Sequence, residues 1–286
     1  MFFGELNSAV SFFDKIVAWR KSRRRIDTVA SRFVSLFEAH GVHRNQMFRL
    51  LGHRSPIADL QNDDTLLRSL TEELLDQAAT LFAVRRDWLD CATDEIYPLH
   101  DFYKKPAEFG LFLDGLLRRR IGDINGVVLV SESDQNEDTA LIVIEETVSF
   151  LDEKPVYRYH LCNNWLFDYW KSRAFLTACV ATAWNKKVYL MGRRVPIDVI
   201  RKYSFGTSFL KYEFDSALPT AGRHWHPEDM AVKPESFLEG VSEGDFGRRQ
   251  AIDLWLQLDQ LGFMKTDLPY NHVSRSFKSR LGSSHT

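Results

Sequence analysis

The chain has 286 residues, of which 44% are hydrophobic and 27% charged, a composition that excludes collagen-like, low-complexity and extensively disordered proteins. Its 37 basic and 39 acidic residues give a net charge of −2, so binding to nucleic acid would require a local basic surface. The length favours about two domains.

The cysteines and the apolar segments favour a cytoplasmic protein. Cys91, Cys162 and Cys179 form no CxxC pair, which argues against a disulfide scaffold or a zinc ribbon. Acidic residues and a lysine interrupt the apolar N-terminus, unlike a secretory signal. No apolar stretch approaches the ~20 residues that span a bilayer. We therefore expect a soluble, cytoplasmic protein with no membrane partner.

Residues 1–26 predict an amphipathic helix followed by a basic arm. Apolar residues recur at the spacing of one helix face: Phe3, Leu6, Val10, Phe13 and Val17. A basic run follows at once, formed by Arg20, Lys21, Arg23, Arg24 and Arg25. A basic amphipathic helix can lie on a membrane surface, but acidic residues dilute this pattern, and packing against a partner helix is the better interpretation.

Residues 27–95 predict a compact, all-α domain of five short helices. Thr28 can cap the first helix, and a second helix is expected over 44–51. Ser69 and Glu72 have the spacing of a capping box before a longer helix. A last, short helix completes the domain.

Two segments of this domain carry a family resemblance: LFEAHGVHRNQMFRLLG (36–52) and SLTEELLDQAATLFAVRRDWLDCA (69–92). The second contains the triplet Asp87, Trp88 and Leu89. Together they resemble the lambda-repressor-like helix-turn-helix domain of the XRE/Cro family over about residues 28–92. The resemblance implies a DNA-binding transcriptional regulator that binds paired half-sites of double-stranded DNA as a homodimer.

The resemblance also implies which residues would contact DNA. A third helix, expected near residues 53–61, would read bases, while the second helix and the basic arm would hold phosphates. The candidate DNA-binding residues are Arg23, Arg24, Arg25, Arg44, Asn45, Gln46, Arg54, Ser55 and Gln61. Acidic residues at 59, 63 and 64 would repel phosphates beside this helix, which favours an alternative. In that alternative, the protein is an adaptor that keeps a degenerate helix-turn-helix scaffold and binds protein instead of DNA.

The charge along this region is strongly asymmetric. From residue 15 to 54, ten basic residues stand against two acidic ones, a net of +8; from 59 to 95, three basic residues stand against ten acidic ones, a net of −7. The cationic part could bind phosphates in a salt-dependent manner. Equally, the two parts could pair between molecules and drive self-association.

The rest of the chain predicts a helical connector over 96–125 and a mixed α+β domain over 126–270. Strands are expected at 126–131, 139–148, 155–161 and 188–191, the first two as a hairpin. Helices are expected within 93–125, over 165–184, after Pro196 and over 248–261. The tail, 271–286, is expected to be flexible. The predicted fold class is thus α+β: an N-terminal all-α, helix-turn-helix-like domain followed by a mixed α+β domain for dimerisation or signal sensing.

The C-terminal half contains no recognisable catalytic motif. His224 and His226, with Glu228 and Asp229, are the nearest metal-binding candidates and carry a second alternative, a metal-dependent hydrolase. An exposed turn with Trp225 packed beneath it is the better interpretation. We expect no enzyme activity, cofactor or metal.

An aromatic cluster offers a different possibility. It comprises Trp165, Phe167, Tyr169, Trp170 and Phe175. Such clusters form core, dimerisation surfaces or pockets for small-molecule effectors, and the sequence leaves these three interpretations open.

Overall fold

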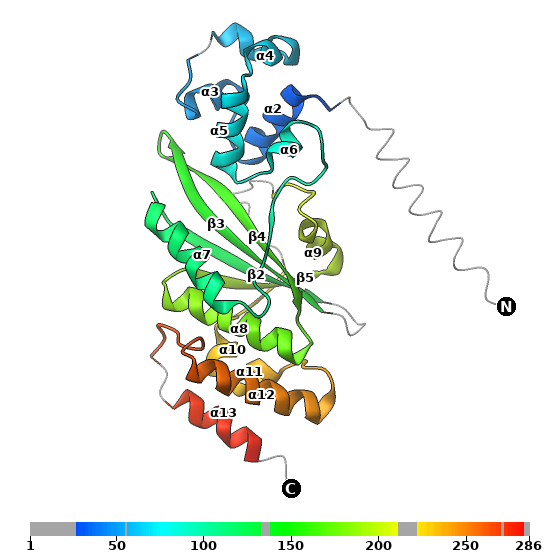
Figure 1. Cartoon of the computed structure of the whole chain (residues 1–286), viewed down its shortest axis with the longest axis vertical. Coiled ribbons are helices and arrows are strands. Elements are labelled where there is room, and N and C mark those ends of the chain that lie inside the picture. Colours follow the sequence, from blue (N-terminus) through cyan, green and yellow to red (C-terminus); the bar gives the residue numbers. More distant parts are fainter. Residues whose placement is uncertain (1–26, 55, 133–137, 211–221, 270–271, 283–286) are drawn as a thin grey trace, which may run out of the picture.

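The computed structural model describes residues 27–54, 56–132, 138–210, 222–269 and 272–282. These residues form an elongated molecule with the N-terminal helices at one end, a sheet in the middle and the C-terminal helices at the other end (Figure 1). The predicted α+β class is confirmed. The predicted helix and arm of residues 1–26 lie outside the described residues.

Short helices build the N-terminal end, which we call the helical head (residues 27–97). They are α2 (Val29–Ala39), η1 (Arg44–Gln46), α3 (Met47–Leu50), η2 (Ile57–Leu60), α4 (Asp63–Ser69), α5 (Glu72–Phe82) and α6 (Arg86–Leu89). Thr28 caps α2 as predicted, because its hydroxyl accepts the Ser31 N–H at 3.1 Å. The two short helices 44–46 and 47–50 fill the predicted second-helix segment.

The predicted capping box at Ser69 and Glu72 is wrong. Asn62 caps an additional helix, α4, and Ser69 is the last residue of that helix. Thr71 instead caps α5, its hydroxyl accepting the Leu74 N–H at 3.3 Å. Ser69 and Thr71 both lie just before α5. The capping-box spacing favours Ser69, but this residue belongs to the end of α4, so Thr71 is the cap.

Within the described residues, six strands form one mixed sheet with the order β1-β4-β3-β2-β5-β6. They are β1 (Leu99–Asp101), β2 (Ile124–Glu132), β3 (Thr139–Leu151), β4 (Lys154–Leu166), β5 (Tyr189–Pro196) and β6 (Arg223–Trp225). β2 and β3 form the predicted antiparallel hairpin, with Val128 opposite Ile142. β5 is parallel to β2, and β1 is parallel to β4.

The central strands are apolar on both faces because both faces are covered. In β2, Val127 and Leu129 belong to the core shared with the helical head, whereas Val128 and Val130 belong to the core on the opposite face. A strand buried on both faces has a continuous apolar run instead of an alternating one. This explains why the strands of the hairpin could be recognised in the sequence.

The remaining helices cover the sheet or stack beyond it. They are α7 (Pro106–Arg119), α8 (Trp170–Asn185), α9 (Ile197–Ser204), α10 (Asp229–Val232), α11 (Pro234–Leu238), α12 (Gly244–Gln260) and α13 (Val273–Gly282). α7 packs beside α8 on the sheet, α12 packs on α8, and α13 packs on α12. The segment expected to connect two domains therefore contributes a strand, β1, and a sheet-covering helix, α7.

The prediction of a flexible tail over 271–286 is wrong for the residues of α13. Phe277 is fully buried and stacks on Trp255, with ring centroids 3.7 Å apart. Val273, Phe277 and Leu281 are spaced for one helix face and all contact the second core. Because Ser, Arg and Lys residues make up most of this segment, its narrow apolar stripe is difficult to recognise in the sequence.

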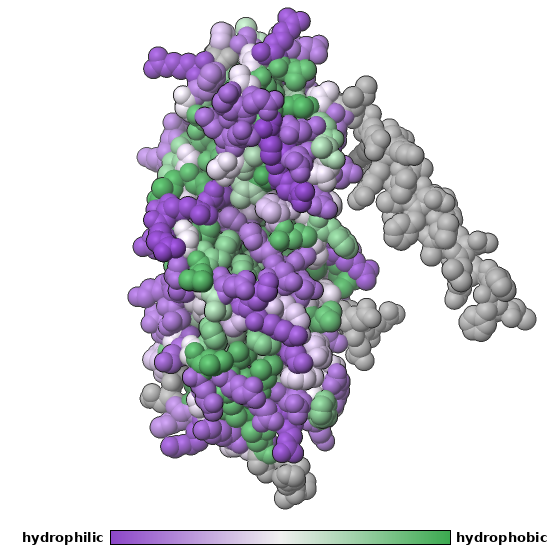
Figure 2. Space-filling view, in the orientation of Figure 1, coloured by the Kyte–Doolittle hydropathy of each residue, from purple (hydrophilic) through white to green (hydrophobic). Residues whose placement is uncertain are grey.

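The described surface is mixed in polarity. Figure 2 shows hydrophilic residues over most of the viewed face, with hydrophobic residues in separate groups between them. Among the described helices, none has the length and apolar character needed to cross a membrane.

Candidate functional site in the helical head

The predicted base-reading helix is reduced to a single turn. The segment expected near residues 53–61 forms only the four-residue 3-10 helix η2, preceded by Pro56. Proline disfavours helical backbone at the residue before it and donates no N–H, and Gly52 has a positive φ of 69°. Pro56 itself has an extended ψ of 138° and η2 ends at Leu60, so the prediction of a third helix over 53–61 is wrong.

The candidate DNA-binding residues that the structure describes do not share one role: some make local hydrogen bonds within the head and others are exposed. Arg23, Arg24, Arg25 and Ser55 lie outside the described residues. The Gln46 side chain accepts the His43 N–H at 3.0 Å and so caps η1, and the Gln61 amide donates to the Ile57 carbonyl at 3.3 Å. Asn45 and Arg54 are exposed.

Arg44 is held inside the head and does not extend from it. Its Nε donates to the Leu60 carbonyl at 2.6 Å, and its Nη1 donates to the Asp63 carboxylate at 2.8 Å. The side chain thereby joins η1 to η2 and to the start of α4. A guanidinium whose donors are used in this way is poorly available for a phosphate.

Most arginines that the structure describes in the head are paired with carboxylates. Arg32 pairs with Asp27 and Asp94, Arg49 with Asp152, Arg85 with Asp87 and Glu95, and Arg86 with Glu72, Asp76 and Asp90. Arg32 is also buried and donates to the Trp88 and Thr93 carbonyls, both at 2.6 Å. Arg54 and Arg68 have no carboxylate partner among the described residues. The net charge of +8 counted along the sequence is thus not a free cationic surface in this part of the chain.

A groove of about 570 Å³ separates α2 from α4 on this head. We call it the acidic groove; its lining includes Thr28, Ser31, Ser35, Glu38, Arg44, Asn62, Asp63, Asp64 and Leu67. Glu38 and Asp64 have no cationic partner among the described residues, whereas Asp63 is paired with Arg44. Unpaired carboxylates give the groove a negative potential, which repels phosphates and attracts Lys or Arg side chains.

A second polar cluster, which the sequence analysis missed, lies on the sheet face that α7 covers, where Arg119 of α7 is 3.5 Å from Glu146 and the Phe112 ring contacts His160. Glu146 on β3 accepts hydrogen bonds from Arg158 at 2.7 and 2.9 Å and from His160 at 3.0 Å. Burial raises the pKa of Glu146, but the bonds from His160 and Arg158 outweigh it and bring the pKa down to about 2. Arg158 also donates to the Thr80 carbonyl of α5 at 3.1 Å, so the cluster ties the head to the sheet. Adjacent glutamates in an otherwise apolar strand were the available signal.

The histidine-rich segment is exposed and has Trp225 packed beneath it, as expected, but its first residues form a strand instead of a turn. Residues Arg223–Trp225 form the edge strand β6, and Trp225 packs against Phe167 with ring centroids 5.6 Å apart. The His224 and His226 rings lie 4.7 Å apart, and Nδ1 of His226 is 3.1 Å from a Glu228 oxygen. Within the described ranges no group of three or more His, Cys, Asp or Glu residues is placed to hold a metal ion.

The comparisons with known proteins found no matching family model, no matching curated protein and no matching solved structure. The helix-turn-helix resemblance therefore stays a prediction.

Proposed function

We propose that this protein is a protein-binding adaptor that assembles with copies of itself, the basic run of one molecule (residues 20–25) binding in the acidic groove of another. The observation that carries the proposal is the charge distribution of the described head. Most of its guanidinium groups are paired internally, while Glu38 and Asp64 face an open groove. Such a surface favours a basic protein segment over a polyanion.

The basic run is a suitable occupant in both charge and position. It contains five cations in six residues and ends two positions before Asp27, close in the chain to Thr28, which lines the groove. Because the run is close in the chain to the groove, two neighbouring molecules can each place their basic run in the acidic groove of the other. Reciprocal contacts of this kind are what a two-fold symmetric dimer requires.

A charge-swap experiment tests the proposal on the full chain. Reversing the run with Arg23→Glu, Arg24→Glu and Arg25→Glu should shift the protein toward monomer in sedimentation velocity, and so should Glu38→Lys with Asp64→Lys. Combining both sets should restore association, because the charges are complementary again. Reversing exposed Lys202 and Arg201 is the matched control. Unchanged association in both reversed variants, or no association of the wild type at low salt, would refute the proposal.

DNA-binding regulation is the second candidate function, supported by exposed Arg54 and by the basic run itself. The groove variant Glu38→Lys with Asp64→Lys separates the two candidates by the sign of its effect. Removing carboxylates near bound phosphates should strengthen binding to a duplex in fluorescence anisotropy and steepen its salt dependence. In the adaptor proposal the same variant weakens self-association, and the wild type binds duplex weakly at physiological salt.

A further inference from the structure

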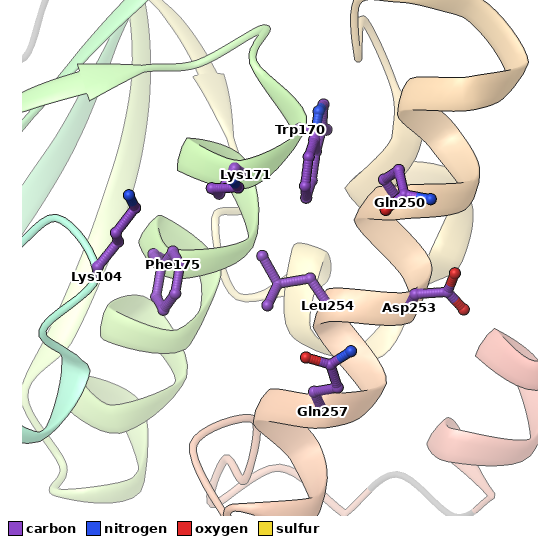
Figure 3. A pocket seen from close by; sticks show the side chains of 8 residues that line it. All are labelled: Lys104, Trp170, Lys171, Phe175, Gln250, Asp253, Leu254 and Gln257. Carbon is purple, nitrogen blue, oxygen red and sulfur yellow. The ribbon is translucent and has the colours of Figure 1, made fainter.

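A separate cavity of about 380 Å³ lies at the other end of the molecule, between α8, α12 and the loop that precedes α7 (Figure 3). Its lining residues are Lys104, Trp170, Lys171, Phe175, Gln250, Asp253, Leu254 and Gln257. The volume falls in the range of small-molecule sites, roughly 300–1,000 Å³. Two members of the predicted aromatic cluster, Trp170 and Phe175, are in this lining, whereas Trp165 and Phe167 are buried core.

The walls of the cavity offer apolar surface that the fold leaves partly uncovered. Trp170 and Phe175 on α8 and Leu254 on α12 pack against the second core, yet each is only partly buried. In Figure 3 the Leu254 side chain extends from α12 toward α8. A planar ring bound here would cover apolar surface on both helices.

Two lysines bring positive charge to the same cavity. The Lys171 ammonium lies 4.9 Å from the centre of the Trp170 ring, and the Lys104 ammonium lies 5.0 Å from that of the Tyr103 ring. A cation–π contact positions an ammonium without neutralising its charge. Neither lysine has a carboxylate partner in the part of the chain that the structure describes, in contrast to most arginines of the head.

The polar groups of α12 complete the lining on the opposite side. The Asp253 carboxylate points away from Trp170 and Phe175 (Figure 3), so it does not face the space between the aromatic residues. Gln250 and Gln257 present amides, which can donate and accept hydrogen bonds. Of the charged residues in the lining, Lys104 and Lys171 therefore lie on the side of the aromatic residues (Figure 3).

We infer that this cavity binds a small, planar aromatic anion. Its ring lies against Trp170 and Phe175, its negative group lies near Lys104 and Lys171, and the glutamine amides bind its polar edge. The free lysines select an anion, and the aromatic walls select a planar ring. An aromatic carboxylate and a nucleoside monophosphate share this chemistry. The site is independent of the head and of the assembly proposed for it.

Calorimetric titration of the full chain with two matched pairs of probes tests the inference. Indole-3-acetate is compared with the uncharged indole-3-acetamide, and adenosine monophosphate with adenosine. We expect at least one anion to bind, and at least tenfold more tightly than its neutral counterpart. Binding of one anion alone identifies the ligand as carboxylate or as nucleotide.

Variants then assign the binding to this cavity. Lys104→Met with Lys171→Met should weaken the anion at least tenfold and leave the neutral probe unchanged. Lys202→Met is the matched control, since the Lys202 ammonium also lies over a tyrosine ring, 5.2 Å from its centre, but does not line the cavity. The inference is overturned if none of the four probes binds, if anion and neutral probe bind equally, or if the lysine variant binds as the wild type does.

Discussion

His40 is a titratable residue enclosed where the head meets the sheet. Its Nδ1–H donates to the Leu36 carbonyl at 2.7 Å, and its ring lies 4.3 Å from Phe82 and 5.6 Å from Tyr159. Burial lowers the pKa of His40 to about 4, although the bond to Leu36 opposes the shift. The imidazole is therefore neutral in the folded protein at neutral pH, and protonating it would place a charge in an apolar contact.

This burial predicts a loss of stability in mild acid. The unfolded chain binds the proton at the ordinary pKa near 6.5, so the unfolded state holds more protons at intermediate pH. The stabilisation is fully present above pH ~6.5 and is lost as pH falls toward ~4, up to about 3 kcal/mol from this residue. Urea unfolding between pH 7.5 and 4.5 should show the decrease, and His40→Phe should flatten it. Parallel curves for the two proteins would show that His40 does not carry the effect.

The candidate site was only partly predictable from single residues. Thr28 was recognised because a hydroxyl before an apolar period is a strong local signal. The internal pairing of Arg44 could not be predicted. Its partners, Leu60 and Asp63, come from a segment whose path depends on Pro56 and Asn62. Charge counted along a sequence cannot show which guanidinium is already paired in space.

At the scale of elements, a helix or strand could be predicted from the sequence when many of its residues are apolar. β2 and β3 were recognised because each contains a continuous run of buried residues. α13 was missed because only Val273, Phe277 and Leu281 contact the core, among seven other residues that are polar or glycine. β1 and β6, at three residues each, are too short to show a period, and their pairing comes from the sheet they join.

Docking of α13 should contribute measurably to stability. Phe277 is fully buried between Trp255 and Phe237, with ring centroids 3.7 and 5.7 Å away. Phe277→Ala should lower the free energy of unfolding by about 3–5 kcal/mol, the usual cost of a large-to-small core substitution. Denaturant unfolding measures this, with exposed Lys278→Ala on the same helix as the control. Equal midpoints for the two variants would mean that α13 does not dock in solution.

At the scale of the molecule, the head and the sheet share one hydrophobic core. Head residues such as Phe37, Phe82 and Leu89 belong to the same buried cluster as Val127 and Tyr159 of the sheet. The backbone N–H groups of residues 96 and 97 both donate to the Gly206 carbonyl beyond α9, at 2.7 and 3.0 Å. The helical head therefore packs as a layer on the sheet and is not a separate domain joined by a linker.

This shared core predicts that head and sheet unfold together. Because removing the sheet would expose one side of the head's core, take Tyr159 from His40 and take the Arg158 donor from the Thr80 carbonyl, a fragment of residues 27–97 should be largely unfolded. In the full chain, Trp88→Phe removes a tryptophan fluorescence signal of the head, and Trp165→Phe removes one of the sheet. Their denaturation midpoints, read by fluorescence and by far-UV circular dichroism, should shift together in a single transition. A folded fragment, or two separated transitions in the full chain, would instead establish the head as an autonomous domain.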